Sequence, residues 1–204
     1  MTAIAAIDAG LSYHTRTLRE PPFDRYFGRL IPLRELSGAS LGDLPLLMIP
    51  CRTHGARLAR VRDQLAEYVE GGGTLVVMGE THPQLFLDGV EFTREKTNYW
   101  WWLDPDGQLG VERSALEHPL VSSLKEEDLN WHVHGTLLLS EPSQTLLRWE
   151  SEAHPGDSVM SLQPRGRGQL LLTTLDPIYH HGSGFMPATT RFLSAFLPAL
   201  CEFV

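Results

Sequence analysis

Cysteine is scarce in this sequence. Cys51 and Cys201 are the only two cysteines in 204 residues, and they are far apart. Two distant cysteines do not build the disulfide framework of a secreted domain, and neither belongs to a C-x-x-C pair. The sequence therefore predicts a protein of the reducing cytoplasm.

Long apolar runs and clustered basic residues are also lacking. No apolar stretch approaches the roughly 18 residues of a membrane span. The apolar segment at residues 1–10 is short and has no basic flank, which favours a first strand over a signal peptide. The formal net charge is −8 at pH 7, whereas binding to nucleic-acid phosphates needs clustered lysine and arginine. We expect neither a membrane nor a nucleic acid as a partner.

The first half of the chain alternates between strand and helix signals. Residues 3–10 predict a buried strand, and residues 28–36 predict a second strand that Pro32 would push to a sheet edge. Residues 44–50 and 74–78 are short apolar runs with a helical pattern between them. The apolar face of that helix consists of Leu58, Val61, Leu65, Tyr68 and Val69. A strand, a helix and a strand joined by short turns predict a parallel βαβ unit.

The second half of the chain is richer in strand signals. Residues 98–112 predict two strands around an Asp-Pro-Asp-Gly turn, residues 145–151 predict another, and residues 159–176 predict two more around Gly-Arg-Gly. The sequence thus predicts one domain, residues 1–204, with an α/β, flavodoxin-like open sheet. This sheet is mainly parallel and has an antiparallel β extension or insertion at roughly residues 90–165.

The C-terminal segment predicts a helix that begins at Pro187. Its buried face would consist of Phe192, Leu193, Phe196 and Leu197. Pro198 should kink or end this helix, because proline lacks the backbone N–H of an α-helix.

Residues 44–86 resemble class I glutamine amidotransferase-like domains. They share the order of a strand ending in a proline turn, a helix, a glycine-rich stop, a strand and a tight turn. The segment YVEGGGTLVV is closest to the ThuA-like (trehalose-utilisation) branch and to the related trimerisation domain of some β-galactosidases. Residues 117–124 and 166–182 also resemble that branch. Together these segments cover about half of the chain.

The catalytic signature of that family is incomplete here. Active amidotransferases carry a cysteine at the tight turn, activated by a distant histidine and a carboxylate. The matching corner in this chain is Gly79, and DPIYHHG stands near the place of the distal His-Pro-Glu element. Cys51 follows the preceding strand, where a small residue in a half-buried turn is the simpler interpretation. The resemblance therefore implies the fold without glutamine hydrolysis.

Nucleotide cofactors are not expected either. Gly71, Gly72 and Gly73 follow a helix and precede a strand, whereas a phosphate cradle lies after a strand at a helix N-terminus. These glycines are therefore interpreted as the end of the helix.

Several polar residues follow predicted strands at turns. In open α/β sheets the carboxyl ends of parallel strands form the ligand crevice. The candidate catalytic residues are His82, His180, Glu80 and Asp176. The candidate ligand-binding residues are His54, Thr81, Tyr179, His181 and Trp101.

The pair His132 and His134 suggests a metal. On a strand, this spacing would put both imidazoles on one face, and Asp176 or Glu80 could complete a set of three ligands. The metal would be a divalent ion such as zinc, with a water in the fourth place. The simpler alternative is that these histidines are hydrogen-bonded residues of turns and sheet edges. No cofactor is certain from this spacing.

The run Tyr99–Trp102 places large aromatics on both faces of a strand, with Trp101 opposite to its two neighbours. Flat aromatics suit sugar faces and also subunit interfaces. Packing in the core or in an interface is the favoured interpretation, and a homo-oligomer would account for the run.

Two functional hypotheses remain open, with a third behind them. The first is a non-glutaminase binding or assembly domain for a small polar ligand, with carbohydrate as one candidate. The second is a ThuA-like enzyme that acts on a sugar or a related small molecule through histidines and carboxylates, with or without a metal. The third is a hydrolase that uses Cys51.

Overall fold

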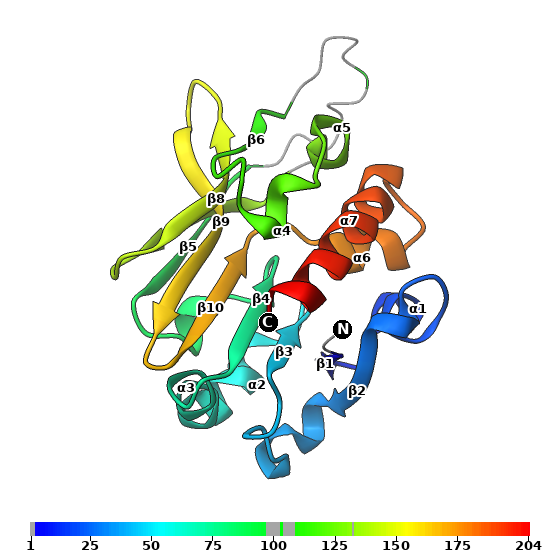
Figure 1. The fold of residues 1–204 in the computed structure, drawn as a ribbon, viewed down its shortest axis with the longest axis vertical. Helices are drawn as coiled ribbons and strands as arrows, with labels where there is room; N and C mark the ends of the chain where they lie inside the picture. The colour runs from blue at the N-terminus through cyan, green and yellow to red at the C-terminus, as the bar shows by residue number, and fades with distance from the viewer. Residues whose placement is uncertain (1–2, 97–102, 104–108, 132) are drawn as a thin grey trace.

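The computed structural model describes residues 3–96, 103, 109–131 and 133–204 (Figure 1). A ten-stranded sheet runs through the molecule in the order β2-β1-β3-β4-β10-β9-β7-β5, and β8 pairs with β9 and with β6. No helix among the described residues is long and apolar enough to cross a membrane.

The first part of the sheet is parallel. It consists of β2 (Phe27–Pro32), β1 (Ile4–Asp8), β3 (Leu46–Ile49), β4 (Thr74–Met78) and β10 (Gly168–Thr173). This is the flavodoxin-like strand order 2-1-3-4-5. Strand β3 pairs in parallel with β4, so the predicted βαβ unit is confirmed. Strand β2 lies at the sheet edge, as its proline predicts.

The second part of the sheet is antiparallel. It consists of β9 (Pro155–Arg165), β7 (Gly135–Leu139), β5 (Val90–Arg94), β8 (Gln144–Glu150) and β6 (Val111–Arg113). The predicted α/β fold with an antiparallel extension is therefore confirmed. The hairpin predicted over residues 98–112 falls largely outside the described residues, which include β6 at its end.

Helices cover both faces of the parallel strands (Figure 1). One face packs against α1 (Ser12–Arg19), α6 (Pro177–Gly182) and α7 (Pro187–Phe203), with α4 (Pro119–Ser122) and α5 (Glu126–Leu129) against α7. The other face packs against α2 (Gly55–Leu58) and α3 (Arg62–Glu70). Alternation along β3 explains the two cores, because Leu46 and Met48 face one side and Leu47 and Ile49 the other.

The two long helices differ in detail from the sequence prediction. The helix between β3 and β4 is interrupted by a 3-10 turn, Ala59–Val61, because Val61 has a φ of −121° and a ψ of 20°. Helix α7 begins at Pro187 as predicted, but it continues through Pro198 to Phe203. Residues on both sides of Pro198 are buried against the sheet, so tertiary packing outweighs the missing backbone hydrogen bond.

Candidate functional site

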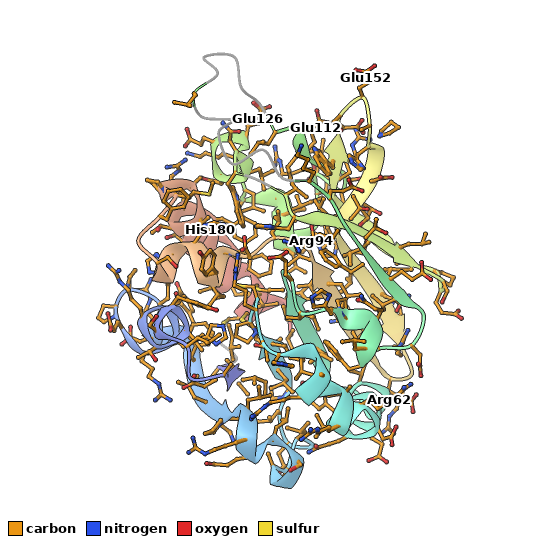
Figure 2. All side chains as sticks on the ribbon, turned by 180° about the vertical axis from the view of Figure 1, so that it is seen from behind. Arg62, Arg94, Glu112, Glu126, Glu152 and His180 are labelled. Carbon is orange, nitrogen blue, oxygen red and sulfur yellow. The ribbon has the colours of Figure 1, made fainter. Side chains whose placement is uncertain are left out.

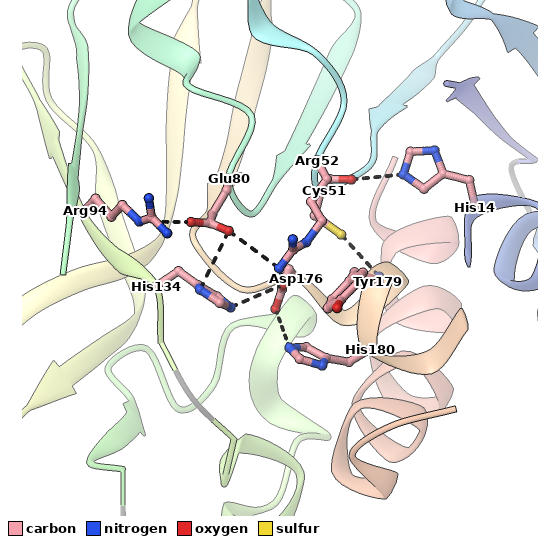
Figure 3. A network of polar contacts seen from close by, with 9 residues as sticks. All are labelled: His14, Cys51, Arg52, Glu80, Arg94, His134, Asp176, Tyr179 and His180. Carbon is pink, nitrogen blue, oxygen red and sulfur yellow. Dashed lines mark hydrogen bonds and ion pairs between the residues drawn. The ribbon is translucent and has the colours of Figure 1, made fainter. Parts of the chain in front are cut away.

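The candidate site lies where β3, β4 and β10 end at the same edge of the sheet. Arg52 follows β3, Glu80 follows β4, and Asp176 follows β10 at the start of α6. His180 comes from α6, and His134 comes from the antiparallel half, directly before β7. Figure 3 shows that their side chains point toward one another. Four segments that are distant in sequence therefore build one polar cluster.

The centre of this cluster is the carboxylate of Asp176. Its Oδ2 atom lies 3.3 Å from Nε2 of His134, and its Oδ1 atom lies 3.1 Å from Nε2 of His180. Asp176 is fully buried. Burial by itself would raise the pKa of Asp176, but the hydrogen bonds and positive charge that the two imidazoles offer hold it well below its usual value. Asp176 is therefore a buried anion at neutral pH.

Glu80 connects this buried centre to the surface. Its Oε1 atom lies 3.4 Å from Nε of Arg94. Its Oε2 atom lies 3.6 Å from Nη2 of Arg52 and 3.8 Å from Nδ1 of His134. The imidazole of His134 thus lies between two carboxylates, those of Glu80 and Asp176 (Figure 3).

Arg52 lies over the cluster in a strained backbone conformation. Its φ is 63°, in the left-handed region that non-glycine residues rarely adopt. Its guanidinium lies 3.8 Å from the centre of the Tyr179 ring, and its Nη2 atom lies 3.7 Å from Oδ2 of Asp176. Such strain persists only where surrounding contacts impose it, and it concentrates at functional sites.

Exposure separates the residues that a ligand could touch from those that support them. The side chains of Arg52 and Arg94 are 34% and 68% exposed, and that of Glu80 is 15% exposed. His134 and Asp176 are almost completely buried. A ligand arriving from solvent would therefore meet the two arginines and Glu80, with the His–Asp–His group beneath them. Seen from behind, Arg94 lies near the middle of the molecule, with Glu152 near the top and Arg62 at the lower right (Figure 2).

The tight turn after β4 has no space for a nucleophile at Gly79. A Cβ atom on Gly79 would lie 2.5 Å from Cβ of Cys51 and 2.8 Å from Cβ of Asp176. The φ of Gly79 is +61°, a conformation that suits glycine. This geometry agrees with the absence of the cysteine that active amidotransferases carry at this tight turn, the nucleophile elbow.

Cys51 is itself a poor nucleophile. It is completely buried, and its Sγ atom accepts a hydrogen bond from the backbone N–H of Tyr179 at 3.2 Å. Burial and the nearby charge of Asp176 raise the pKa of the thiol well above its usual value. Because the thiolate is the reactive form, the position does not favour a hydrolase that uses Cys51.

The His134, Asp176 and His180 side chains could hold a metal ion. Each offers one ligand atom, these atoms all lie within 4.8 Å of one another, and all three residues are buried. Two imidazole nitrogens and one carboxylate oxygen suit zinc and other divalent transition metals. The remaining nitrogen of His134 faces Glu80, as the outer nitrogen of a metal-bound histidine usually faces a carboxylate.

The metal pair predicted from the sequence changes in the structure. His132 lies outside the described residues. His134 does not lie on a strand as expected, because β7 begins only at Gly135, which pairs with Arg94 of β5. The partners of His134 are therefore Asp176 and Glu80, which the sequence offered only as additional ligands.

Two of the predicted histidines lie at the same sheet edge but outside the cluster. His54 is exposed at the start of α2, and His82 is exposed with a φ of 55°. Their turns touch, since a Cβ atom on Gly55 would lie 3.4 Å from Cβ of His82. The ring of His82 packs edge-on against Phe92, with 6.2 Å between ring centres. The structure thus brings His180 to Asp176 and leaves His54 and His82 at the surface.

The remaining candidate residues have varied positions. Thr81 is fully buried, and its hydroxyl has no hydrogen-bond partner among the described residues. His181 lies on α6 and not in a turn, and its Nδ1 atom lies 2.8 Å from Oγ1 of Thr190, away from Asp176. Tyr179 lies under Arg52. Trp101 lies outside the described residues.

Sequence reasoning missed the two arginines of the cluster. Arg52 stands two residues before His54, at the same strand end, so the rule that pointed to His54 also applied to it. Arg94 ends strand β5 of the antiparallel half, and no local pattern connects it to Glu80.

Fold and site together define a class of protein: an open α/β sheet of flavodoxin-like order, with a polar cluster at its carboxyl edge and a glycine at the elbow. No family model matches the chain, and no curated protein matches its sequence. Solved structures do match, and they include β-galactosidases and a protein described as ThuA-like.

One similar structure is a cytoplasmic protein from Salmonella typhimurium LT2, with a TM-score of 0.64 and 14% identity over 100% of this chain and 98% of that one. A second is a β-galactosidase from Bacillus circulans sp. alkalophilus, with a TM-score of 0.58 and 13% identity over 99% of this chain. A third is a protein from Bacteroides uniformis described as ThuA-like, with a TM-score of 0.54 and 15% identity over 96% of this chain and 89% of that one. The chain spans only 31% of the β-galactosidase. At such identities these similarities show the fold alone.

Proposed function

We propose that this chain is a non-glutaminase binding or assembly domain whose ligand is a small polar molecule. The observation that carries this proposal is the buried anion of Asp176, held between two imidazoles beneath Arg52 and Glu80 at the carboxyl edge of the sheet. The lack of space at Gly79 supports binding over acyl transfer from the elbow.

Carbohydrate is the ligand class to test first. A sugar hydroxyl both donates and accepts hydrogen bonds, and here Glu80 offers acceptors while Arg52 and Arg94 offer donors within one cluster. The similarity to part of a β-galactosidase and to a ThuA-like protein supports the same choice.

The test is isothermal titration calorimetry with glucose, galactose and trehalose. Glu80→Gln keeps the shape of the side chain but removes its charge, so we expect the affinity to fall about tenfold. Glu91→Gln is the matched control, because Glu91 is exposed on β5 outside the cluster, and its affinity should equal that of the wild type. No binding by the wild type, or equal losses in both variants, would contradict the proposal.

A second candidate function is a ThuA-like enzyme that acts on a sugar or related molecule with a bound metal. The observation that favours it is the buried His134–Asp176–His180 group. Such an ion would supply activated water near neutral pH. In this hypothesis the ion is held by His134, Asp176 and His180. The substrate above it is oriented by Arg52 and Glu80.

Elemental analysis of untagged protein purified without chelator separates the two candidates. The enzyme predicts near-stoichiometric metal in the wild type and in a His54→Ala/His82→Ala control, and its loss in His134→Ala/His180→Ala. Wild-type protein without metal, even after zinc is added back, would contradict the hypothesis of a metal enzyme and leave that of a binding domain.

We also propose that the protein is a cytoplasmic homo-oligomer. Both cysteines are free and buried, as suits a reducing compartment, and two similar Salmonella typhimurium proteins are described as cytoplasmic. Light scattering after size-exclusion chromatography tests self-association, and a monomer at micromolar concentration would contradict it.

A further inference from the structure

A cavity of about 520 Å³ lies beside Arg52, at the carboxyl ends of β1, β2 and β3. Strand β1 lies between β2 and β3, so the strand order of the sheet reverses at this point. Open α/β sheets bind ligands at such a switch point. The volume lies within the roughly 300–1,000 Å³ of small-molecule sites. The lining comes from residues 8–11, Arg19, residues 32–34, Arg52, His54 and Arg57.

The charge of this lining opposes that of the whole chain. Four arginines face the cavity with one aspartate, in a protein whose formal net charge is −8. Arg19 is paired with Asp8 at 2.6 Å. Arg34 is paired with Glu35 at 3.0 Å, but both are largely exposed, so this pair holds weakly. Arg57 has no ion pair among the described residues, and its charge is therefore available to a ligand.

Arg52 also has unused hydrogen-bond donors at this edge of the sheet. Its contacts with Glu80 and Asp176, at 3.6 and 3.7 Å, are longer than hydrogen bonds. Its Nε atom is buried and has no hydrogen-bond partner among the described residues. A planar guanidinium matches the two oxygens of a carboxylate or a phosphate.

Two backbone amides of the loop after β1 already have partners within the protein. The N–H of Gly10 donates to Oδ1 of Asp8 at 2.8 Å, and the N–H of Ala9 faces Nδ1 of His14 at 3.4 Å. Arginine side chains therefore supply most of the positive charge for recognition in this cavity. Leu11, Pro32 and Leu33 add an apolar part to the lining.

We propose that this cavity binds a small organic acid whose carboxylate or phosphate pairs with Arg52 and Arg57. The carbon skeleton of the acid packs against Leu11, Pro32 and Leu33. This assignment rests on the proposed binding function and adds that the ligand is negatively charged.

The experiment compares glucose, glucuronate, glucose 6-phosphate and inorganic phosphate by isothermal titration calorimetry. At least one of the two acid sugars should bind more tightly than glucose, and whichever binds best identifies carboxylate or phosphate as the recognised group. Arg57→Gln should weaken that acid about tenfold, because it removes one charge-assisted contact. Arg60→Gln is the control, since Arg60 is exposed on the neighbouring turn outside the lining. Equal losses in both variants, or acids that bind no better than glucose, would overturn the assignment.

The Glu80→Gln variant separates failure of this inference from failure of the proposed function. If glucose binding depends on Glu80 while the acids gain nothing, the cluster binds a neutral ligand and the arginine cavity does not. If acid binding depends on Arg57 and is unchanged in Glu80→Gln, the cavity is the site and the cluster above Asp176 is not.

Discussion

Gly79 and Cys51 approach each other so closely that a Cβ atom on Gly79 would lie 2.5 Å from Cβ of Cys51. Gly79 also has a φ of +61°. We therefore expect Gly79→Ala to lower the free energy of unfolding by at least about 2 kcal/mol, through overpacking and backbone strain. Urea denaturation measures this loss. Gly38→Ala is the matched control, because a Cβ atom there meets no heavy atom within 4 Å. Equal effects of the two substitutions would show that the turn at Gly79 tolerates a side chain.

The charge of Asp176 should make stability depend on pH. Its pKa is below the ordinary value of 3.8 in the folded protein, so the ionised carboxylate stabilises the fold above that pH. This stabilisation is lost as the pH falls through the lowered pKa. We expect Asp176→Asn to lower the free energy of unfolding by about 3 kcal/mol near neutral pH, because the two imidazoles lose the charge of their buried carboxylate partner.

The difference between wild type and Asp176→Asn should stay constant from about pH 7 to about pH 5 and shrink as the pH falls from about 4 to about 2, measured by urea denaturation at each pH. Asp43→Asn serves as the control, because Asp43 is exposed and lies outside the cluster. A difference that stays constant down to about pH 2 would mean that Asp176 carries no stabilising charge.

Cys51 should react with iodoacetamide only when the protein unfolds. The thiol is buried and its pKa is raised, so little reactive thiolate reaches the reagent. Mass spectrometry of native protein should show slow modification, and protein in guanidinium should react rapidly at both Cys51 and Cys201. Rapid alkylation of Cys51 alone in the native protein would restore the hypothesis of a hydrolase that uses it.

Much of the fold was accessible from local patterns. The apolar runs at residues 44–50 and 74–78 predicted strands covered on both faces, because only such strands lack polar alternation. Pro32 predicted an edge strand, and the structure has β2 at the edge. The continuation of α7 through Pro198 was not accessible, because packing against the sheet and not local propensity decides it.

Local sequence patterns were enough to show that polar residues follow the parallel strands and that no nucleophile stands at the elbow. Periodicity and turn composition carry that information, since both are local. Which of these residues meet depends on long-range packing. His134 enters from the antiparallel half to pair with Asp176, whereas His82 turns outward at a φ of 55°. Side-chain direction at a turn depends on backbone angles and long-range packing, and burial then sets the charge of Asp176.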